Sequence, residues 1–190
     1  MYTLLAVCCG WGILTWIVEK KGPMKGWDFG DSNIYGQALI VYDPDPFYNF
    51  DEQVCLSVAE VFTENGMKVK VVSVAAAGEH DLKTFDVLVF CANTYNWSPD
   101  WAIQDFIKGQ KSLHGKPVMA ITLGAGSTAS SKKKLEHLIS SKDGTILGSG
   151  TFWLMRPNDE ARMNESNVRV ALSMVRNWSE SLVYEYRKIN

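Results

Sequence analysis

The sequence predicts an open, doubly wound sheet of five parallel strands with helices on both faces, preceded by an N-terminal transmembrane helix. Two observations predict this organisation. No charged residue occurs between Tyr2 and Val18. Short, continuously apolar runs then alternate with longer segments whose apolar residues recur at helical spacing. Strands that are apolar throughout belong to a sheet covered on both faces, which requires parallel strands joined by crossover helices.

The charge-free segment Tyr2–Val18 predicts a membrane anchor over residues 1–19. As a helix it would measure roughly 25 Å, close to the roughly 30 Å thickness of a bilayer core. Lys20, Lys21 and Lys25 follow it and no lysine or arginine precedes it. By the positive-inside rule, the rest of the chain then lies in the cytoplasm. We therefore expect a single-pass membrane protein that contacts the membrane through this helix.

Residues 20–36 are rich in glycine and polar side chains, which predicts a linker. The folded domain is expected to occupy residues 37–190. A net charge of -2 gives no reason to expect nucleic-acid binding. The cysteines and histidines do not have the spacing of a zinc site, so no metal centre is expected.

The first half of the domain supplies three strands. The apolar run 38–42 is the first strand, and the helix expected at 51–65 has apolar residues at helical spacing and stops before Gly66, a residue that commonly follows helices. Two further apolar runs, 69–74 and 86–92, predict the second and third strands.

The second half continues the alternation. Helical spacing of apolar residues predicts a helix over 99–108, and the run 117–123 predicts the fourth strand. A helix at 130–141, a fifth strand at 145–154 and a long closing helix at 167–186 complete the pattern. Ligands of doubly wound sheets bind beyond the carboxyl ends of the strands, so the loops 43–50, 93–99 and 124–128 are the candidate site.

Two of these loops suit a planar heteroaromatic ring. The loop after the third strand offers two aromatic rings, amides and a hydroxyl, and the loop after the fourth offers glycines that let backbone N–H groups approach a ligand. The candidate residues are Asn93, Thr94, Tyr95, Asn96 and Trp97 in the former, and Gly124, Ala125 and Gly126 in the latter. The alternative is that Tyr95 and Trp97 pack on the helix that begins near Pro99.

Three stretches carry a resemblance to a known family: ALIVYDPDPFYNFDEQVCLSVAEVFTENG, DVLVFCANTYNWSPDWAIQDFIKG and LHGKPVMAITLGAG. From about Gln37 to its end the chain resembles the flavodoxins and the flavodoxin-like oxidoreductases. The resemblance implies a flavodoxin-like fold and the cofactor FMN. It also implies that the two loops flank the isoalloxazine ring, with contacts from Thr94, Tyr95, Asn96, Trp97, Gly124, Ala125 and Gly126.

The first loop departs from the family's pattern, a Ser/Thr-x-Thr-Gly-Asn-Thr run that holds the FMN phosphate. Only Asn49 falls in register with it. Pro44 and Pro46 each lack a backbone donor, and acidic residues surround them. The phosphate-binding loop is therefore degenerate. FMN binding here would rely on backbone amides around Asn49–Glu52.

Three functions remain open from the sequence. The first is an FMN protein that transfers electrons to a redox or membrane protein partner, or reduces a small acceptor as an oxidoreductase. The second is a flavin-free module that kept the fold and binds a protein at the membrane. The third is a Mg-dependent phosphotransferase, with Asp43 as nucleophile and Asp45 as general acid.

Overall fold

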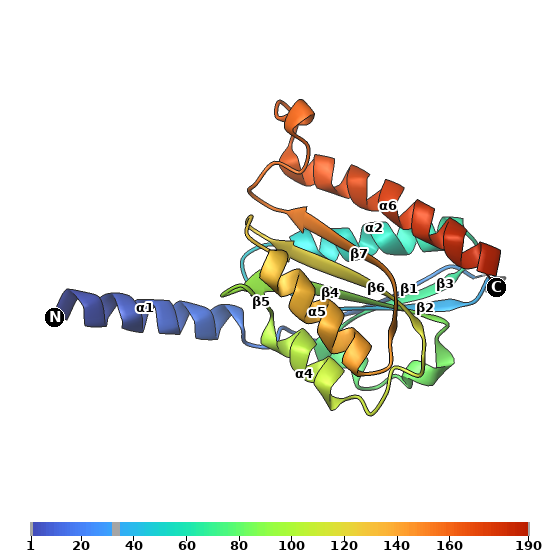
Figure 1. Cartoon of the computed structure of the whole chain (residues 1–190), viewed down its shortest axis with the longest axis horizontal. Coiled ribbons are helices and arrows are strands. Elements are labelled where there is room, and N and C mark those ends of the chain that lie inside the picture. The colour runs from blue at the N-terminus through green and yellow to red at the C-terminus, as the bar shows by residue number, and fades with distance from the viewer. Residues whose placement is uncertain (1, 32–34, 190) are drawn as a thin grey trace.

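A computed structural model describes residues 2–31 and 35–189 of the chain. It shows a three-layer α/β domain, with a twisted sheet between two layers of helices and one helix projecting from the domain (Figure 1). Residues 32–34, which belong to the predicted linker, and the terminal residues 1 and 190 lie outside the described part.

Five parallel strands form the centre of the sheet, and their order along it is β3-β2-β4-β6-β7. Chain order therefore reverses between β2 and β4, which is the topological switch point of a doubly wound sheet. Their bounds are β2 (Gln37–Tyr42), β3 (Lys68–Ser73), β4 (Val87–Tyr95), β6 (Pro117–Gly124) and β7 (Thr145–Trp153).

The prediction of a five-stranded sheet is corrected by two additional strands, which bring the total to seven in the described residues. The strand β1 (Gly26–Phe29) pairs antiparallel with β3, and the two-residue β5 (Ser98–Pro99) pairs antiparallel with the end of β4. The strand β1 lies within the predicted linker. Its Trp27 and Phe29 pack against the core, but a four-residue alternation next to glycines is too short to predict a strand.

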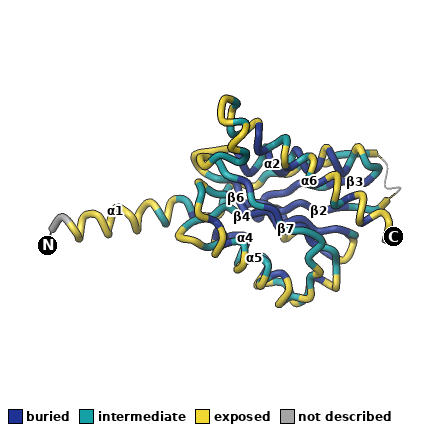
Figure 2. The backbone as a smooth tube through the Cα atoms, turned by 45° about the horizontal axis from the view of Figure 1, so that its top comes forward, coloured by how far each residue is buried: buried dark blue, intermediate teal, exposed yellow. Residues whose placement is uncertain are grey.

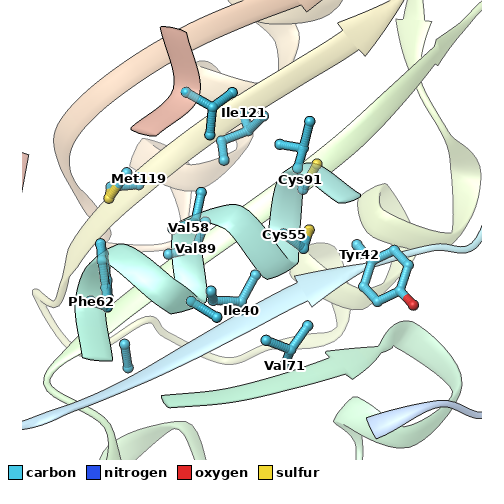
Figure 3. Close-up of a cluster of buried hydrophobic side chains, with 14 of the residues drawn as sticks. Ile40, Tyr42, Cys55, Val58, Phe62, Val71, Val89, Cys91, Met119 and Ile121 are labelled. Atoms are coloured by element: carbon cyan, nitrogen blue, oxygen red, sulfur yellow. The ribbon is translucent and has the colours of Figure 1, made fainter. Parts of the chain in front are cut away.

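Helices cover both faces of the sheet, and alternate strand residues point to each layer. Ile40 and Tyr42 pack with α2 and α6, as Figure 3 shows for α2, whereas Leu39 and Val41 pack with α3, α4 and α5. The helices are α2 (Phe50–Glu64), α3 (Val74–Ala77), α4 (Trp101–Gly109), α5 (Ala129–Ser141) and α6 (Asn167–Ile189), with single 3₁₀ turns at Leu82–Thr84 and Glu160–Arg162. The sheet between them is buried (Figure 2).

The remaining helix, α1 (Tyr2–Val18), extends away from the domain and is largely exposed (Figures 1 and 2). Among the described residues, no helix combines the length and the apolar character needed to cross a membrane. The transmembrane anchor predicted at residues 1–19, and the single-pass topology that rested on it, are therefore not supported. The physical reason is length: α1 has 17 residues, or about 25 Å of helix against a bilayer core of about 30 Å.

The segment after α1, which begins the predicted linker at residues 20–36, is packed against the domain. The backbone N–H of Gly22 donates to Asp43 Oδ1 at 2.9 Å. Lys25 and Ser73 are joined twice, by Lys25 N to Ser73 Oγ at 2.9 Å and by Ser73 N to Lys25 O at 3.0 Å. A Cβ atom at Gly22 would lie 2.8 Å from Pro44 Cδ, so the chain passes this close to the loop after β2 only because position 22 is glycine.

Candidate functional site

A cavity of about 190 Å³ opens at the carboxyl ends of the parallel strands, beside the switch point between β2 and β4. Four strand-end segments converge there, from β2, β4, β6 and β7. The lining residues are Asp45, Tyr48, Phe50, Asp51, Asn93, Thr94, Tyr95, Gly124, Ala125, Leu154 and Met155. Its position is the one that ligands of doubly wound sheets occupy.

A tight hairpin between β4 and β5 presents the aromatic residues of the second loop. Its two central residues, Asn96 and Trp97, have positive φ angles of 48° and 59°. Two successive residues in this region match the two-residue hairpin turns that suit twisted strands. A left-handed conformation is unusual for tryptophan and is found mostly where the surrounding structure imposes it. The Trp97 side chain is 61% exposed.

Trp97 does not line the first cavity but a second, more open hollow of about 200 Å³ beside it. Thr94 and Ala125 line both. The other residues of the second hollow are Trp11, Asn96, Trp97, Gly126 and Ser127. The loops after β4 and β6 therefore face each other across two adjacent depressions, one against Tyr95 and one against Trp97.

Gly124 lets these two loops come close together. A Cβ atom there would lie 2.7 Å from Thr128 Cγ2 and 3.1 Å from Thr94 Cβ. The loop after β7 is tied to the same segment, because Leu154 N donates to Gly124 O and Arg156 N to Ala125 O, each at 2.9 Å. The wall of the cavity formed by β6 and β7 is thus held by backbone hydrogen bonds.

The carboxylate of Asp45 organises the first loop. Its Oδ1 accepts hydrogen bonds from Phe47 N at 2.7 Å and from Tyr48 N at 2.9 Å. Its Oδ2 accepts from the Tyr95 hydroxyl. A side chain of the loop therefore satisfies two donors of the loop and connects it to the end of β4.

The carboxylate of Asp51, in the first turn of α2, completes this arrangement. Its Oδ2 accepts from Asp45 N at 2.7 Å and from Asn93 Nδ2 at 3.1 Å, and its Oδ1 accepts from Glu52 N at 2.7 Å. Asn93 Nδ2 also lies 3.3 Å from Asp43 O. Backbone N–H groups at positions 45, 47, 48 and 52 thus all donate to carboxylates of the same segment.

Several carboxyl groups near the site are buried, and burial raises their pKa values. Burial raises the pKa of Asp43 and of Asp51 to about 6, against the partly compensating effect of hydrogen bonds from backbone N–H groups. Burial likewise raises the pKa of Glu19 to about 7, while its hydrogen bond from Trp101 N opposes the shift. The pKa of the fully buried Asp100 lies well above its ordinary value for the same reason.

The structure brings together most of the residues that the sequence singled out. Asn93, Thr94, Tyr95, Gly124 and Ala125 line the first cavity, and Asn96, Trp97 and Gly126 line the adjacent hollow. Asn49 lines neither, although its neighbours Tyr48 and Phe50 line the first cavity. It precedes α2 and its Oδ1 accepts from Gln53 Nε2 at 2.6 Å.

Sequence reasoning missed the part of the lining that follows β7, and the role of the acids. Leu154 and Met155 could have been found, because the fifth predicted strand ends at the same sheet edge as the others. The sequence predicts Asp45 as a possible general acid, and Asp45 and Asp51 otherwise only as acidic residues around the prolines of the first loop. An aspartate in a turn commonly accepts from the backbone two residues on, as Asp45 does from Phe47 N, but the bonds to Asp51 follow no such local pattern.

The position of Asp43 does not support the phosphotransferase interpretation. Asp43, its proposed nucleophile, is buried beneath the segment at Gly22 and does not line the cavity. Within residues 2–31 and 35–189, no group of three or more histidine, cysteine, aspartate or glutamate side chains is arranged to hold a metal ion. The chemistry of that class needs both a reachable nucleophile and a magnesium ion.

Comparison with known proteins identifies the fold. No protein-family model matches the chain, and no curated protein sequence matches it. Among solved structures, a flavodoxin from Streptococcus pneumoniae is similar at a TM-score of 0.59 and 16% identity, covering 78% of this chain and 99% of its own. An archaeal flavodoxin is similar at a TM-score of 0.58 and 10% identity, with 80% and 99% covered.

The domain has the flavodoxin fold. The same fold occurs in an azoreductase from Bacillus anthracis, which is similar at a TM-score of 0.55 and 11% identity, covering 76% of this chain and 99% of its own. The expectation of a flavodoxin-like α/β fold is thus confirmed. The cavity of this flavodoxin-like domain lies at the switch point of its sheet, where the loops after β2, β4 and β6 meet.

Proposed function

We propose that this flavodoxin-like protein binds the isoalloxazine ring of a flavin between the loops after β4 and β6 and takes part in electron transfer. The observation that carries the proposal is the cavity itself. It brings Thr94 and Tyr95 opposite Gly124 and Ala125, at the switch point of the fold. A bound flavin would supply the redox chemistry, while the protein supplies stacking, hydrogen bonds and shielding from water.

The fold comparisons support a redox role. Flavodoxins are similar over more than three quarters of the chain. One similar protein, from Megasphaera elsdenii, is described as a two-electron reduced flavodoxin and has a TM-score of 0.52. Whether this chain acts as an electron carrier or reduces a small acceptor depends on its partner, and the proposal covers both.

The site suits the ring of FMN better than its phosphate. The ring side offers Tyr95, Thr94 and the backbone around Gly124. On the phosphate side, the backbone donors at positions 47 and 48 are already bonded to Asp45. These contacts therefore favour binding of the flavin ring over binding of the FMN phosphate.

Ring binding is tested with the full chain and lumiflavin, a flavin that consists of the ring system without a sugar or phosphate. We expect saturable quenching of lumiflavin fluorescence at micromolar protein concentrations, about 8 kcal/mol of binding free energy. Gly124→Val should abolish quenching, because its side chain would meet Thr94 and Thr128. Gly109→Val is the matched control, since a Cβ at Gly109 meets nothing within 4 Å.

A flavin-free binding module is the second candidate, and two observations favour it. The cavity of about 190 Å³ is smaller than the roughly 300–1,000 Å³ of typical small-molecule sites. In addition, three backbone N–H groups of the first loop, at positions 45, 47 and 48, already donate to the carboxylates of Asp51 and Asp45. If the full chain quenches neither lumiflavin nor any longer flavin, and Gly124→Val behaves like the wild type, this second function replaces the first.

We further propose that α1 lies against a lipid surface, without crossing it. A helix that is apolar on all sides buries those residues against another apolar phase. Lysines follow the helix and would favour an anionic surface. The exposed apolar side chains of α1 are Leu4, Leu5, Val7, Trp11, Ile13, Leu14, Trp16 and Ile17.

This contact is tested by flotation with vesicles that contain an anionic phospholipid. We expect the full chain to float with the vesicles, and Ile13→Asp to reduce the bound fraction at least about tenfold, because a charge in the apolar phase is costly. Met163→Asp is the control, since Met163 is comparably exposed but lies near the start of α6. Equal flotation of the two variants would contradict the assignment to α1.

A further inference from the structure

We infer that the site selects a flavin without a phosphate, such as riboflavin, over FMN. The inference rests on the proposed function, because it assumes that the ring binds between the loops after β4 and β6. It goes beyond that function by naming which flavin is bound. What carries it is the way the loop between β2 and α2 uses its own hydrogen-bond donors.

A phosphate held at the start of a helix needs free backbone N–H groups that point toward it. Four N–H groups in and just after this loop, those of residues 45, 47, 48 and 52, are engaged by carboxylates of the same segment. Phe47 N and Tyr48 N donate to Asp45 Oδ1, at 2.7 and 2.9 Å. The N–H groups of residues 45 and 52 donate to Asp51, each at 2.7 Å. Pro44 and Pro46 have no N–H to offer.

The carboxylates of Asp45 and Asp51 therefore take the place in which a bound anion would sit. A phosphate could reach these N–H groups only by displacing them. Asp51 is 2% exposed, so displacement would leave a buried carboxylate without its donors. Losing hydrogen bonds to a buried charged group is among the most costly changes in a folded protein.

The negative charge of the cavity also disfavours a phosphate. The lining of the cavity includes Asp45 and Asp51 but, in the part of the chain that the structure describes, no lysine or arginine. The nearby Lys25 is paired with Glu52, Nζ to Oε2 at 2.6 Å. A dianionic phosphate would approach two carboxylates in a partly dehydrated site, where like charges repel more strongly than in water.

The same carboxylates suit a neutral tail. The sugar-alcohol chain of riboflavin carries hydroxyl groups, which donate hydrogen bonds, and carboxylate oxygens are strong acceptors with more than one lone pair each. Asp45 and Asp51 could accept from these hydroxyls while keeping the N–H donors of the loop. The cavity should therefore bind the hydroxyl-bearing tail of riboflavin more tightly than the phosphate-bearing tail of FMN.

Two sources of positive charge near the site could oppose this selectivity. Arg156 directly follows Met155 of the cavity lining, and its backbone N–H donates to Ala125 O. Lys20, Lys21 and Lys25 are the second source. They line a separate, open hollow of about 610 Å³ together with Pro44 and Pro46. If FMN extended its phosphate over this loop into that hollow, it would bind at least as tightly as riboflavin. A titration that compares the affinities of FMN and riboflavin would detect this.

The test compares lumiflavin, riboflavin and FMN by fluorescence titration of the full chain at pH 7.5. We expect riboflavin to bind at least about tenfold more tightly than FMN. Asp45→Asn should reduce the ratio of the riboflavin affinity to the FMN affinity at least about threefold. The amide oxygen still accepts from Phe47 N and Tyr48 N, while the negative charge is lost. Asp105→Asn, an exposed charge change on α4, should leave the ratio unchanged.

The outcomes separate the inference from the function on which it rests. If FMN binds as tightly as riboflavin or more tightly, the inference is wrong and flavin binding stands. If no flavin is bound, both fail. If riboflavin is preferred but Asp45→Asn leaves the ratio unchanged, the first loop does not cause the selectivity and the inference is overturned. Circular dichroism of each variant shows whether it is folded.

Discussion

Replacing Asp100 by alanine is expected to lower the free energy of unfolding by about 2–4 kcal/mol, the largest effect of any single substitution near the site. Asp100 precedes α4, and its Oδ1 accepts from Ile103 N at 2.8 Å, the bond of a helix N-cap. Its Oδ2 accepts from Asn93 N at 2.9 Å. The side chain is 1% exposed, so alanine would leave two inaccessible N–H groups without partners.

Urea denaturation of the full chain measures this loss. Asp105→Ala is the matched control, since Asp105 lies on α4, is largely exposed and makes only a 3.9 Å contact with Lys108. It should change the free energy of unfolding by less than about 0.5 kcal/mol. Asp100→Asn should fall between the two, because the amide keeps one acceptor oxygen and loses the other. A stability of Asp100→Ala equal to that of Asp105→Ala would show that Asp100 does not hold the β4–α4 connection.

The second large effect expected is a fall in stability as the pH rises from 5 to 8. In the folded chain the pKa of Asp43 and of Asp51 is about 6, and that of Glu19 is about 7. The unfolded chain loses these protons near the ordinary values of 3.8 for aspartate and 4.5 for glutamate. Between those limits the folded state holds more protons, so unfolding becomes easier as the pH increases.

The magnitude follows from the size of the shifts. A pKa raised by about two units costs up to roughly 3 kcal/mol above both pKa values. Because three carboxyl groups act together, we expect a drop of several kcal/mol between pH 5 and pH 8, seen as a lower melting temperature. Glu19→Gln and Asp43→Asn should each flatten the profile, and Asp105→Asn should not. A melting temperature that stays level or rises across this interval would refute the prediction.

The sequence predicts the central sheet because its strands are apolar without interruption. Residues such as Leu39, Ile40 and Val41 must be covered on both faces, and this fixes a parallel sheet and the edge at which a site forms. From that edge alone, Thr94 and Tyr95 could be placed near Gly124 and Ala125. The strand β1 and the helix α3 escape prediction because each is too short to show a period.

The internal hydrogen bonding of the first loop was beyond sequence reasoning for a different reason. Acids beside prolines are equally typical of an exposed turn. Two of their partners also lie far away in the chain: Tyr95 donates to Asp45 across 50 positions, and Asn93 to Asp51 across 42. Only the folded structure shows that these acids satisfy donors which would otherwise be available to a ligand.

The attachment of α1 has a consequence for encounters with other molecules. Trp11 Nε1 donates to Asn96 Oδ1 at 3.2 Å, Asn96 Nδ2 donates to Thr15 Oγ1 at 3.3 Å, and Glu19 accepts from Trp101 N at 2.7 Å. The first two bonds join α1 to the hairpin between β4 and β5, and the third joins the residue after α1 to the start of α4. Whatever holds α1 therefore also sets the orientation of the domain, with the strand-end edge turned toward that support and the opposite edge turned away.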